Sequence, residues 1–115
     1  MPYYLIQVGY TPEAWAAMVK NPQNRIEAIR PAAAKVGGKI EAGYLSFGEY
    51  DLVTIAEFPD NASAAAFALA ATSGGAVKAY KTTPLMTMDE GLTAMKKAGS
   101  TGYKPPSARA PAKRR

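Results

Sequence analysis

The residues with the clearest chemical potential lie in the short stretch GEYDLV, which separates two apolar segments of the chain. It contains Gly48, Tyr50 and Asp51. Asp51 could act as a base or a polar anchor, with Tyr50 beside it at the mouth of a pocket. Turns rich in Gly and Asp are nevertheless common without chemistry, and the sequence supplies no partner for the carboxylate. We therefore interpret the stretch first as a turn, in which Gly48 takes a positive φ and Asp51 accepts hydrogen bonds from turn amides.

Polar side chains inside strand-like segments form a second group of candidates. They are Gln7, Tyr44, Ser46, Thr54, Glu57, Lys78, Tyr80 and Thr82. Several could converge on a mostly apolar cavity, the usual setting of a small-ligand site. A buried Glu57 would have a raised pKa and could serve as a base, whereas the simpler alternative is an ion pair with Lys78 or Lys81. The face that each polar residue occupies stays open, because a shift of one residue in register exchanges the two faces.

Together, the turn and the strands give one predicted set of ligand-binding residues. The set is Gln7, Tyr44, Tyr50, Asp51, Glu57 and Tyr80. No catalytic residue is assigned, because none of these side chains has an evident partner in the sequence.

The absence of cysteine and histidine excludes several kinds of chemistry. Disulfides, zinc–thiolate sites, iron–sulfur clusters, cysteine nucleophiles and Ser-His-Asp triads all need these residues. The acidic residues have no metal-loop spacing, so neither a metal nor a cofactor is expected. Any acid–base chemistry must fall to Asp, Glu, Lys or Tyr.

Charge divides the chain into a neutral body and a basic tail. Residues 1–97 carry nine basic and nine acidic side chains, so the net charge of +5 comes from residues 98–115. This tail is rich in Gly, Ser, Pro and Ala and cannot bury a core, so we predict that it is disordered. Residues 1–97 form the predicted domain. Nucleic acid is not an expected partner, except through weak, salt-sensitive attraction to the tail.

The N-terminal segment MPYYLIQVGY reads as a strand rather than a signal peptide, because it lacks a basic region and a cleavage site. No apolar run approaches the length of a membrane span. The sequence therefore predicts a cytoplasmic protein without a membrane span.

Cap and turn signals divide the body into strands and helices. Thr11-Pro12 and Asn21-Pro22 open helical segments, and Gly37 provides a left-handed cap for the second. Pro31 should kink or split that second helix. The predicted strands are 2–10, 39–47, 51–58 and 76–86, and the later helices are 61–73 and 89–97. A hairpin connection, Gly48 to Tyr50, joins the two middle strands.

This β-α-β-β-α-β order predicts an α+β, ferredoxin-like fold, with a four-stranded antiparallel sheet and two helices on one face. The strand predicted over 51–58 is apolar on both sides, with Leu52 and Phe58 on one face and Val53 and Ile55 on the other. A sheet with one open face should instead alternate cleanly. We therefore expect a second subunit to cover the other face, in a homodimer or a higher even assembly.

The segment GGKIEAGYLSFGEYDLVTIAEFPD, Gly37 to Asp60, resembles the GYD-domain family, which is named for the Gly-x-Tyr-Asp turn found here at Gly48, Tyr50 and Asp51. The Gly-Tyr-Thr-Pro at residues 9–12 and the Ser-Gly-Gly-Ala-Val at residues 73–77 are similar to other parts of its pattern, while Pro31 departs from it. The resemblance covers about residues 3–90. It implies a ferredoxin-like unit of the dimeric α/β-barrel kind, and it implies no activity because the family's function is uncharacterised.

Three hypotheses of function follow. The first is a homo-oligomeric module that binds a small organic ligand in the cavity between packed sheets. The second is a cofactor-independent enzyme of the monooxygenase or isomerase type, in which Tyr44, Glu57 and Tyr80 would act. The third is an interaction module that uses the basic tail.

Overall fold

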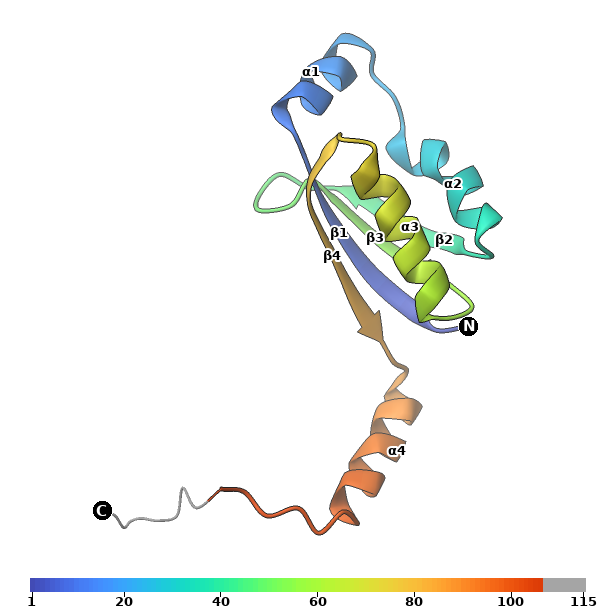
Figure 1. Cartoon of the computed structure of the whole chain (residues 1–115), viewed down its shortest axis with the longest axis vertical. Helices are drawn as coiled ribbons and strands as arrows, with labels where there is room; N and C mark the ends of the chain where they lie inside the picture. Colours follow the sequence, from blue (N-terminus) through green and yellow to red (C-terminus); the bar gives the residue numbers. More distant parts are fainter. Residues whose placement is uncertain (107–115) are drawn as a thin grey trace, which may run out of the picture. The chain divides into compact units, whose positions relative to one another are not determined.

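The computed structural model describes residues 1–106 and divides the chain into two compact units, Met1–Leu85 and the residues from Met86 onward. Figure 1 shows the elements in order. They are β1 (Tyr3–Tyr10), α1 (Pro12–Lys20), α2 (Arg25–Lys35), β2 (Lys39–Leu45), β3 (Leu52–Glu57), α3 (Asn61–Ser73), β4 (Val77–Leu85) and α4 (Met88–Gly99). All predicted strands and helices are present, with small changes at their ends.

The four strands form one antiparallel sheet in the order β2-β3-β1-β4. Helices α2 and α3 lie on one face of this sheet (Figure 1). The prediction of an α+β fold with a four-stranded antiparallel sheet is confirmed. The predicted connection at residues 48–50 was too short, because β2 ends at Leu45 and β3 begins only at Leu52.

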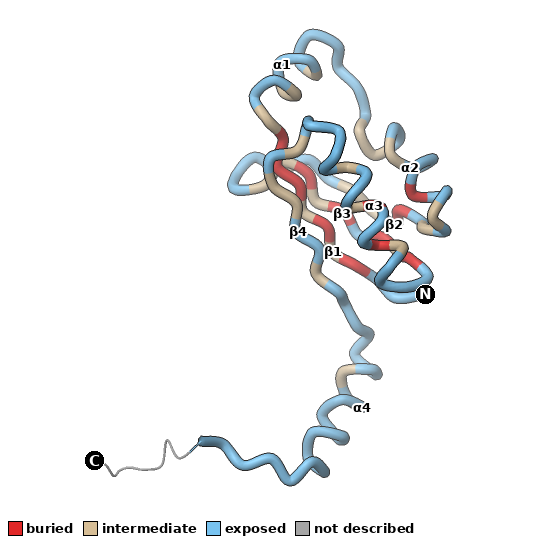
Figure 2. The backbone as a smooth tube through the Cα atoms, viewed as in Figure 1, coloured by how far each residue is buried: buried red, intermediate tan, exposed pale blue. Residues whose placement is uncertain are grey.

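The core lies between the sheet and the helices that cover it (Figure 2). Alternate residues of the two central strands point into it, as the period of a strand requires. From β1 and β3 these are Tyr4, Ile6, Val8, Tyr10, Leu52, Thr54 and Ala56. Helix α2 contributes Ala33, and α3 contributes Ala64 and Phe67. Small helix residues let both helices lie close to the strands.

The predicted caps at Thr11 and Gly37 are in place, whereas the helix start predicted at Asn21-Pro22 is wrong, because Asn21 ends α1 and Asn24 caps α2. The Thr11 side chain accepts a hydrogen bond from the Ala14 amide, and Asp60 caps α3 by accepting from Ser63. Gly37 has φ +80° at the end of α2, as predicted for a left-handed cap. The next residue, Gly38, must also be glycine, because a Cβ there would collide with the Phe58 ring.

The prediction that Pro31 splits the second helix is wrong. Helix α2 runs without a break from Arg25 to Lys35, through the proline. Pro31 removes one backbone hydrogen bond from the helix. Packing of α2 onto the sheet stabilises the helix and offsets the loss of that hydrogen bond.

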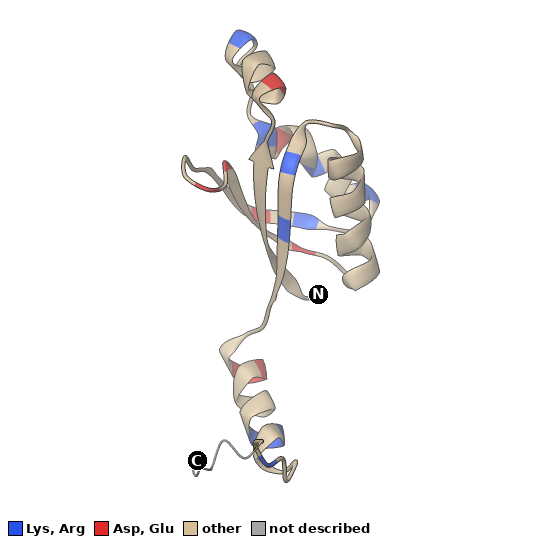
Figure 3. Ribbon diagram, turned by 60° about the vertical axis from the view of Figure 1, so that its left-hand side comes forward, with Lys and Arg blue, Asp and Glu red and all other residues tan. Residues whose placement is uncertain are grey.

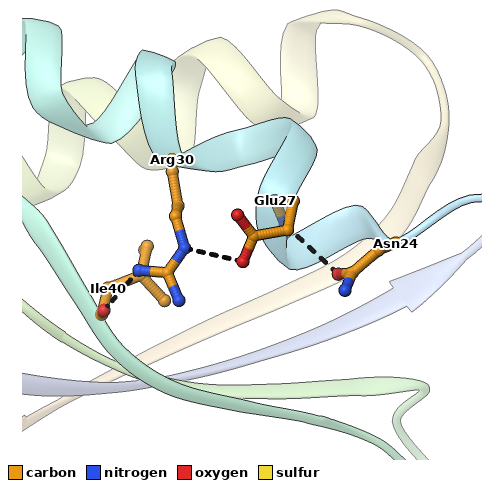
Figure 4. Close-up of polar contacts among 4 residues, drawn as sticks. All are labelled: Asn24, Glu27, Arg30 and Ile40. Atoms are coloured by element: carbon orange, nitrogen blue, oxygen red, sulfur yellow. Dashed lines mark hydrogen bonds and ion pairs between the residues drawn. The ribbon is translucent and has the colours of Figure 1, made fainter.

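An arginine one residue before the proline ties α2 to the edge of the sheet (Figure 4). Arg30 donates from Nη1 to the Ile40 carbonyl at 2.8 Å and from Nε to Glu27 at 3.0 Å. Ile40 lies where the register of β2 against β3 shifts, at a β-bulge that includes Glu41. Arg30 therefore binds a backbone carbonyl of β2 beside this bulge.

The second unit contains α4, which opens with a capping box between Thr87 and Glu90. Its methionines Met88 and Met95 are exposed rather than packed in a core. The helix continues to Gly99, so the first residues of the predicted tail are helical. The rest of that prediction falls largely on residues 107–115, which lie outside the described part. Within residues 1–106, no helix has the length and apolar character needed to cross a membrane.

Candidate functional site

Asp51, the acidic residue of the Gly-x-Tyr-Asp turn, connects strands and helix that are distant in sequence. Its Oδ2 accepts hydrogen bonds from the Tyr10 amide at 2.9 Å and from the Trp15 indole Nε1 at 3.2 Å. Its own amide donates to the Val8 carbonyl at 2.8 Å. Asp51 thus holds the end of β1 and the first turn of α1 against the start of β3. The Asp51 carboxylate therefore stabilises the fold.

Hydrogen bonds donated by Ser46, rather than a special conformation of Gly48, close the loop between β2 and β3. The Ser46 amide donates to the Asp51 carbonyl, and the Ser46 hydroxyl donates to the Tyr50 carbonyl at 2.6 Å. The glycines with positive φ among residues 1–106 are Gly37, Gly75 and Gly102, so the positive φ predicted for Gly48 is wrong. A loop of residues 46–51 is long enough to reverse the chain without a left-handed residue.

The structure distributes the predicted ligand-binding residues over three places. Gln7, Tyr44 and Glu57 lie on the face of the sheet opposite the helices, which we call the open face. Tyr50 and Asp51 lie in the loop before β3. Tyr80 lies on the helix-covered face, beside Val8 of β1. Tyr80 is thus separated from the open-face residues by the thickness of the sheet.

Glu57 has charged neighbours on its own side of the sheet. The carboxyl of Glu41, in the β2 bulge, hydrogen-bonds to it and raises its pKa, and partial burial adds to the shift. Lys39 lies near and bridges to Glu41 at 3.7 Å. Neither Lys78 nor Lys81 pairs with Glu57 within residues 1–106, because β1 separates β4 from β3. Figure 3 shows basic and acidic residues interspersed along the first unit, as the neutral charge sum predicted.

A cavity of about 340 Å³ lies on the helix-covered face, between α2, α3 and the sheet. Small residues of both helices border it, among them Ala32 of α2 and Ala70 and Ala71 of α3. An α3 built from alanine places little side-chain volume over the strands, so space is left unfilled between the helix and the sheet. Ile6 and Val8 of β1 contribute to the apolar floor.

Two residues that line this cavity carry a hydroxyl group without a hydrogen-bond partner. The two groups are Thr54 Oγ1 on β3 and the Tyr80 hydroxyl on β4, and both atoms are buried. Thr54 is 2% exposed, and burial raises the pKa of Tyr80 to about 12. Both hydroxyls are therefore neutral groups that can donate and accept hydrogen bonds. Buried polar atoms are rarely left unpaired, so these two hydroxyls have unused hydrogen-bonding capacity beside the cavity.

One charged side chain borders the cavity. Arg25, the first residue of α2, is half-buried there, and its Nη1 donates to Gln23 Oε1 at 2.6 Å. No carboxylate within residues 1–106 forms an ion pair with it. Burial raises the pKa of the nearby Tyr10 hydroxyl, and the guanidinium opposes this shift. The cavity therefore combines apolar walls, two neutral hydroxyls and one cation.

Sequence reasoning identified Thr54 and Tyr80 as polar strand residues but did not select Thr54, and it missed Arg25 altogether. A signal for Thr54 existed, because it alternates with Leu52 and Ala56 on one face of the strand. Nothing local distinguishes Arg25 from the other basic residues on the helices. Within residues 1–106, no group of acidic side chains could hold a metal ion.

Comparison with known proteins gives one family and one relative of similar length. The GYD domain family matches residues 4–95. A Thermus thermophilus protein described as "Glutamine synthetase and cystathionine beta-lyase binding protein" is 31% identical over 78 residues, which cover 68% of this chain and 82% of the relative.

Two solved structures are more distant. A crystal structure of an FFRP protein has a TM-score of 0.46 and 14% identity, and the match covers 75% of this chain and 100% of that one. A Nitrosomonas europaea protein of unknown function has a TM-score of 0.42 and 18% identity, with 75% of this chain and 89% of that one covered.

Proposed function

The chain belongs to the GYD domain family, and we propose that it is a homo-oligomeric module that binds a small organic ligand. The ligand occupies the cavity between α2, α3 and the sheet. One observation carries this proposal: Thr54 and Tyr80 line the same cavity, and each has a buried hydroxyl without a hydrogen-bond partner. A ligand that hydrogen-bonds to both would remove the cost of leaving them unpaired, about 1–3 kcal/mol for each group.

The size and lining of the cavity also support a small organic ligand. Its volume of about 340 Å³ is near the lower end of the range of about 300–1,000 Å³ that is common for ligand pockets. Apolar walls with a few polar groups are the usual composition of such pockets. The lining contains no carboxylate, and burial raises the pKa of Tyr80 to about 12, so neither supplies a ready general base for the alternative of a cofactor-independent enzyme.

A second subunit forms part of the proposal because of the open face. Tyr3 and Ile55 project from it and are 39% and 37% exposed, and the half-buried Leu5 and Val53 lie on the same face. A second copy that packs sheet to sheet would cover these side chains and complete a dimeric α/β barrel of ferredoxin-like units. A further cavity between the two sheets, near Gln7, Tyr44 and Glu57, stays a prediction that depends on this dimer.

A filling substitution tests the cavity. Ala71→Leu places a larger side chain in it, and Ala66→Leu adds the same volume to an exposed position of α3 that does not border it. Binding of phenol can be followed by NMR chemical shifts. We expect phenol to shift the resonances of residues around the cavity in the parent and in Ala66→Leu, but not in Ala71→Leu. Equal binding to Ala71→Leu, or perturbations confined to the open face, would contradict the proposed location.

A second candidate function is recognition of another protein, and the loop between β2 and β3 favours it. Phe47 is 100% exposed there, and Tyr44 and Leu45 beside it are 70% and 63% exposed. Adjacent exposed apolar residues mark contact sites. The Thermus thermophilus relative is described as binding two enzymes. If this chain has such partners, Phe47→Ser should weaken its binding to purified glutamine synthetase or cystathionine beta-lyase, whereas Val19→Ser should not.

A further inference from the structure

The charges and polar groups of the helix-side cavity restrict the chemistry of its ligand. This inference rests on the proposed function, because it concerns the same cavity. Arg25 is the charged side chain among the residues that border it. A cation without a carboxylate partner, at the edge of an apolar cavity, favours a ligand that carries a negative charge.

The polar groups lie in two separate regions. Arg25 begins α2, so its guanidinium belongs to the helix side of the cavity. Thr54 and Tyr80 belong to the sheet and flank β1, since Thr54 pairs with Ile6 and Tyr80 pairs with Val8. Apolar side chains such as Ile29 and Phe67 border the space as well. A ligand that satisfies all of these groups needs an anionic end, an apolar middle and a polar end.

We propose that the ligand is a small monoanionic aromatic acid that also carries a hydroxyl or carbonyl group. Its carboxylate accepts hydrogen bonds from Arg25, and its apolar body lies between α2, α3 and the sheet. Its second polar group hydrogen-bonds to Thr54 and Tyr80. Since both hydroxyls can donate and accept, they fit either a hydroxyl or a carbonyl.

Four aromatic probes separate these contributions. 4-Hydroxybenzoate has both polar ends, benzoate lacks the hydroxyl, phenol lacks the carboxylate, and 4-hydroxybenzylamine reverses the charge. A longer acid, 3-(4-hydroxyphenyl)propanoate, tests the distance between the two polar regions. Calorimetric titration of each probe into the full-length protein gives the affinities. We expect at least one of the two hydroxylated acids to bind more tightly than phenol, and the amine to bind least.

Variants assign each preference to a side chain. Arg25→Gln should weaken the binding of the hydroxylated acid by roughly tenfold or more, because it removes a charge-assisted hydrogen bond. The affinity for phenol should stay unchanged. Lys35→Gln, at the exposed end of the same helix, is the matched control and should change neither. Thr54→Val and Tyr80→Phe keep the shape of the cavity and should remove the advantage of 4-hydroxybenzoate over benzoate.

The possible failures have different meanings. If phenol binds as well as both acids and Arg25→Gln changes nothing, the anionic ligand is wrong while the proposed cavity function stands. Tighter binding of the amine would overturn the charge argument in the same way. If a probe binds the parent as expected, the Ala71→Leu variant must lose that binding, because it fills the cavity. If no probe binds the parent at millimolar concentration, the ligand class proposed here is wrong, and ordered water would account for the two hydroxyls.

Discussion

The helix-covered face and the open face of one sheet carry similar apolar residues in different surroundings. On β1, Ile6 is 2% exposed on the covered face, whereas Tyr3 on the open face is 39% exposed. On β3, the covered face buries Thr54, and the open face presents Ile55 and Glu57. Strand alternation places residues on two faces, but only packing against α2 and α3 removes one of those faces from water. The two faces should therefore respond differently to the same kind of substitution.

The largest difference is expected from removal of an aromatic ring. Phe58 is fully buried and packs against Tyr4 and Phe67, so Phe58→Ala should lower the free energy of unfolding by about 3–5 kcal/mol. Phe47→Ala removes the same ring from an exposed loop and should change it by less than about 0.5 kcal/mol. Urea unfolding of both variants measures the contrast, and equal losses would show that the covered face is not the main core.

A smaller loss is expected at Asp51, which connects the covered strands to α1. Asp51→Ala leaves the Tyr10 amide and the Trp15 indole N–H without their acceptor and should cost about 2 kcal/mol. Trp15 is the single tryptophan, so its fluorescence should shift when the contact is lost. Glu49→Ala, in the same loop and exposed, is the control. An unchanged stability and spectrum would mean that Asp51 is free to serve as a ligand-binding group.

On the open face, a polar substitution should affect association more than folding. Ile55→Ser should lower the stability of the dilute monomer by about 1 kcal/mol, because the side chain is already partly exposed. In the proposed dimer the same change places a hydroxyl in the interface and should shift sedimentation toward monomer. Val19→Ser, on α1, should leave the assembly unchanged. A parent protein that sediments as a monomer would exclude the sheet-to-sheet dimer.

The smallest effect is expected at Glu57, and its sign depends on pH. The neighbouring Glu41 raises the folded-state pKa of Glu57, so the ionised form is less favourable in the folded protein than in the unfolded chain. The stability that the protonated form contributes is present below the ordinary pKa of glutamate and is lost as pH rises through the raised value. Glu57→Gln should therefore be slightly more stable than the parent at neutral pH.

That gain should disappear at low pH, where the carboxyl is protonated in both states. Thermal unfolding of the parent and of Glu57→Gln over a pH series tests this. A gain that persists in acid would mean that the two carboxyls do not interact.

Much of the fold could be read from local signals. Thr11 and Gly37 each mark the end of a helix by chemistry confined to one turn, and each was found in its predicted role. The predicted helix over 61–73 has the bounds Asn61–Ser73. Pro31 was misjudged because its effect depends on packing as well as on the lost hydrogen bond.

The candidate site was harder to predict. Thr54 and Tyr80 belong to different strands that do not pair with each other and meet on one face only because β1 lies between them. Arg25 reaches the same cavity from a helix. Gln7, Tyr44 and Glu57 are on the other face, because the alternation and register of the strands assign each side chain to one face.

The sequence by itself determined the strands and helices, the apolar character of both sheet faces, and the absence of cysteine and histidine chemistry. These depend on residue type and on short-range spacing, which act within a few residues. The tertiary structure decided which polar groups share a cavity and which partners Asp51 binds, across separations of 36 and 41 residues. Strand order and register create such contacts, and they follow from the packing of the whole sheet against its helices.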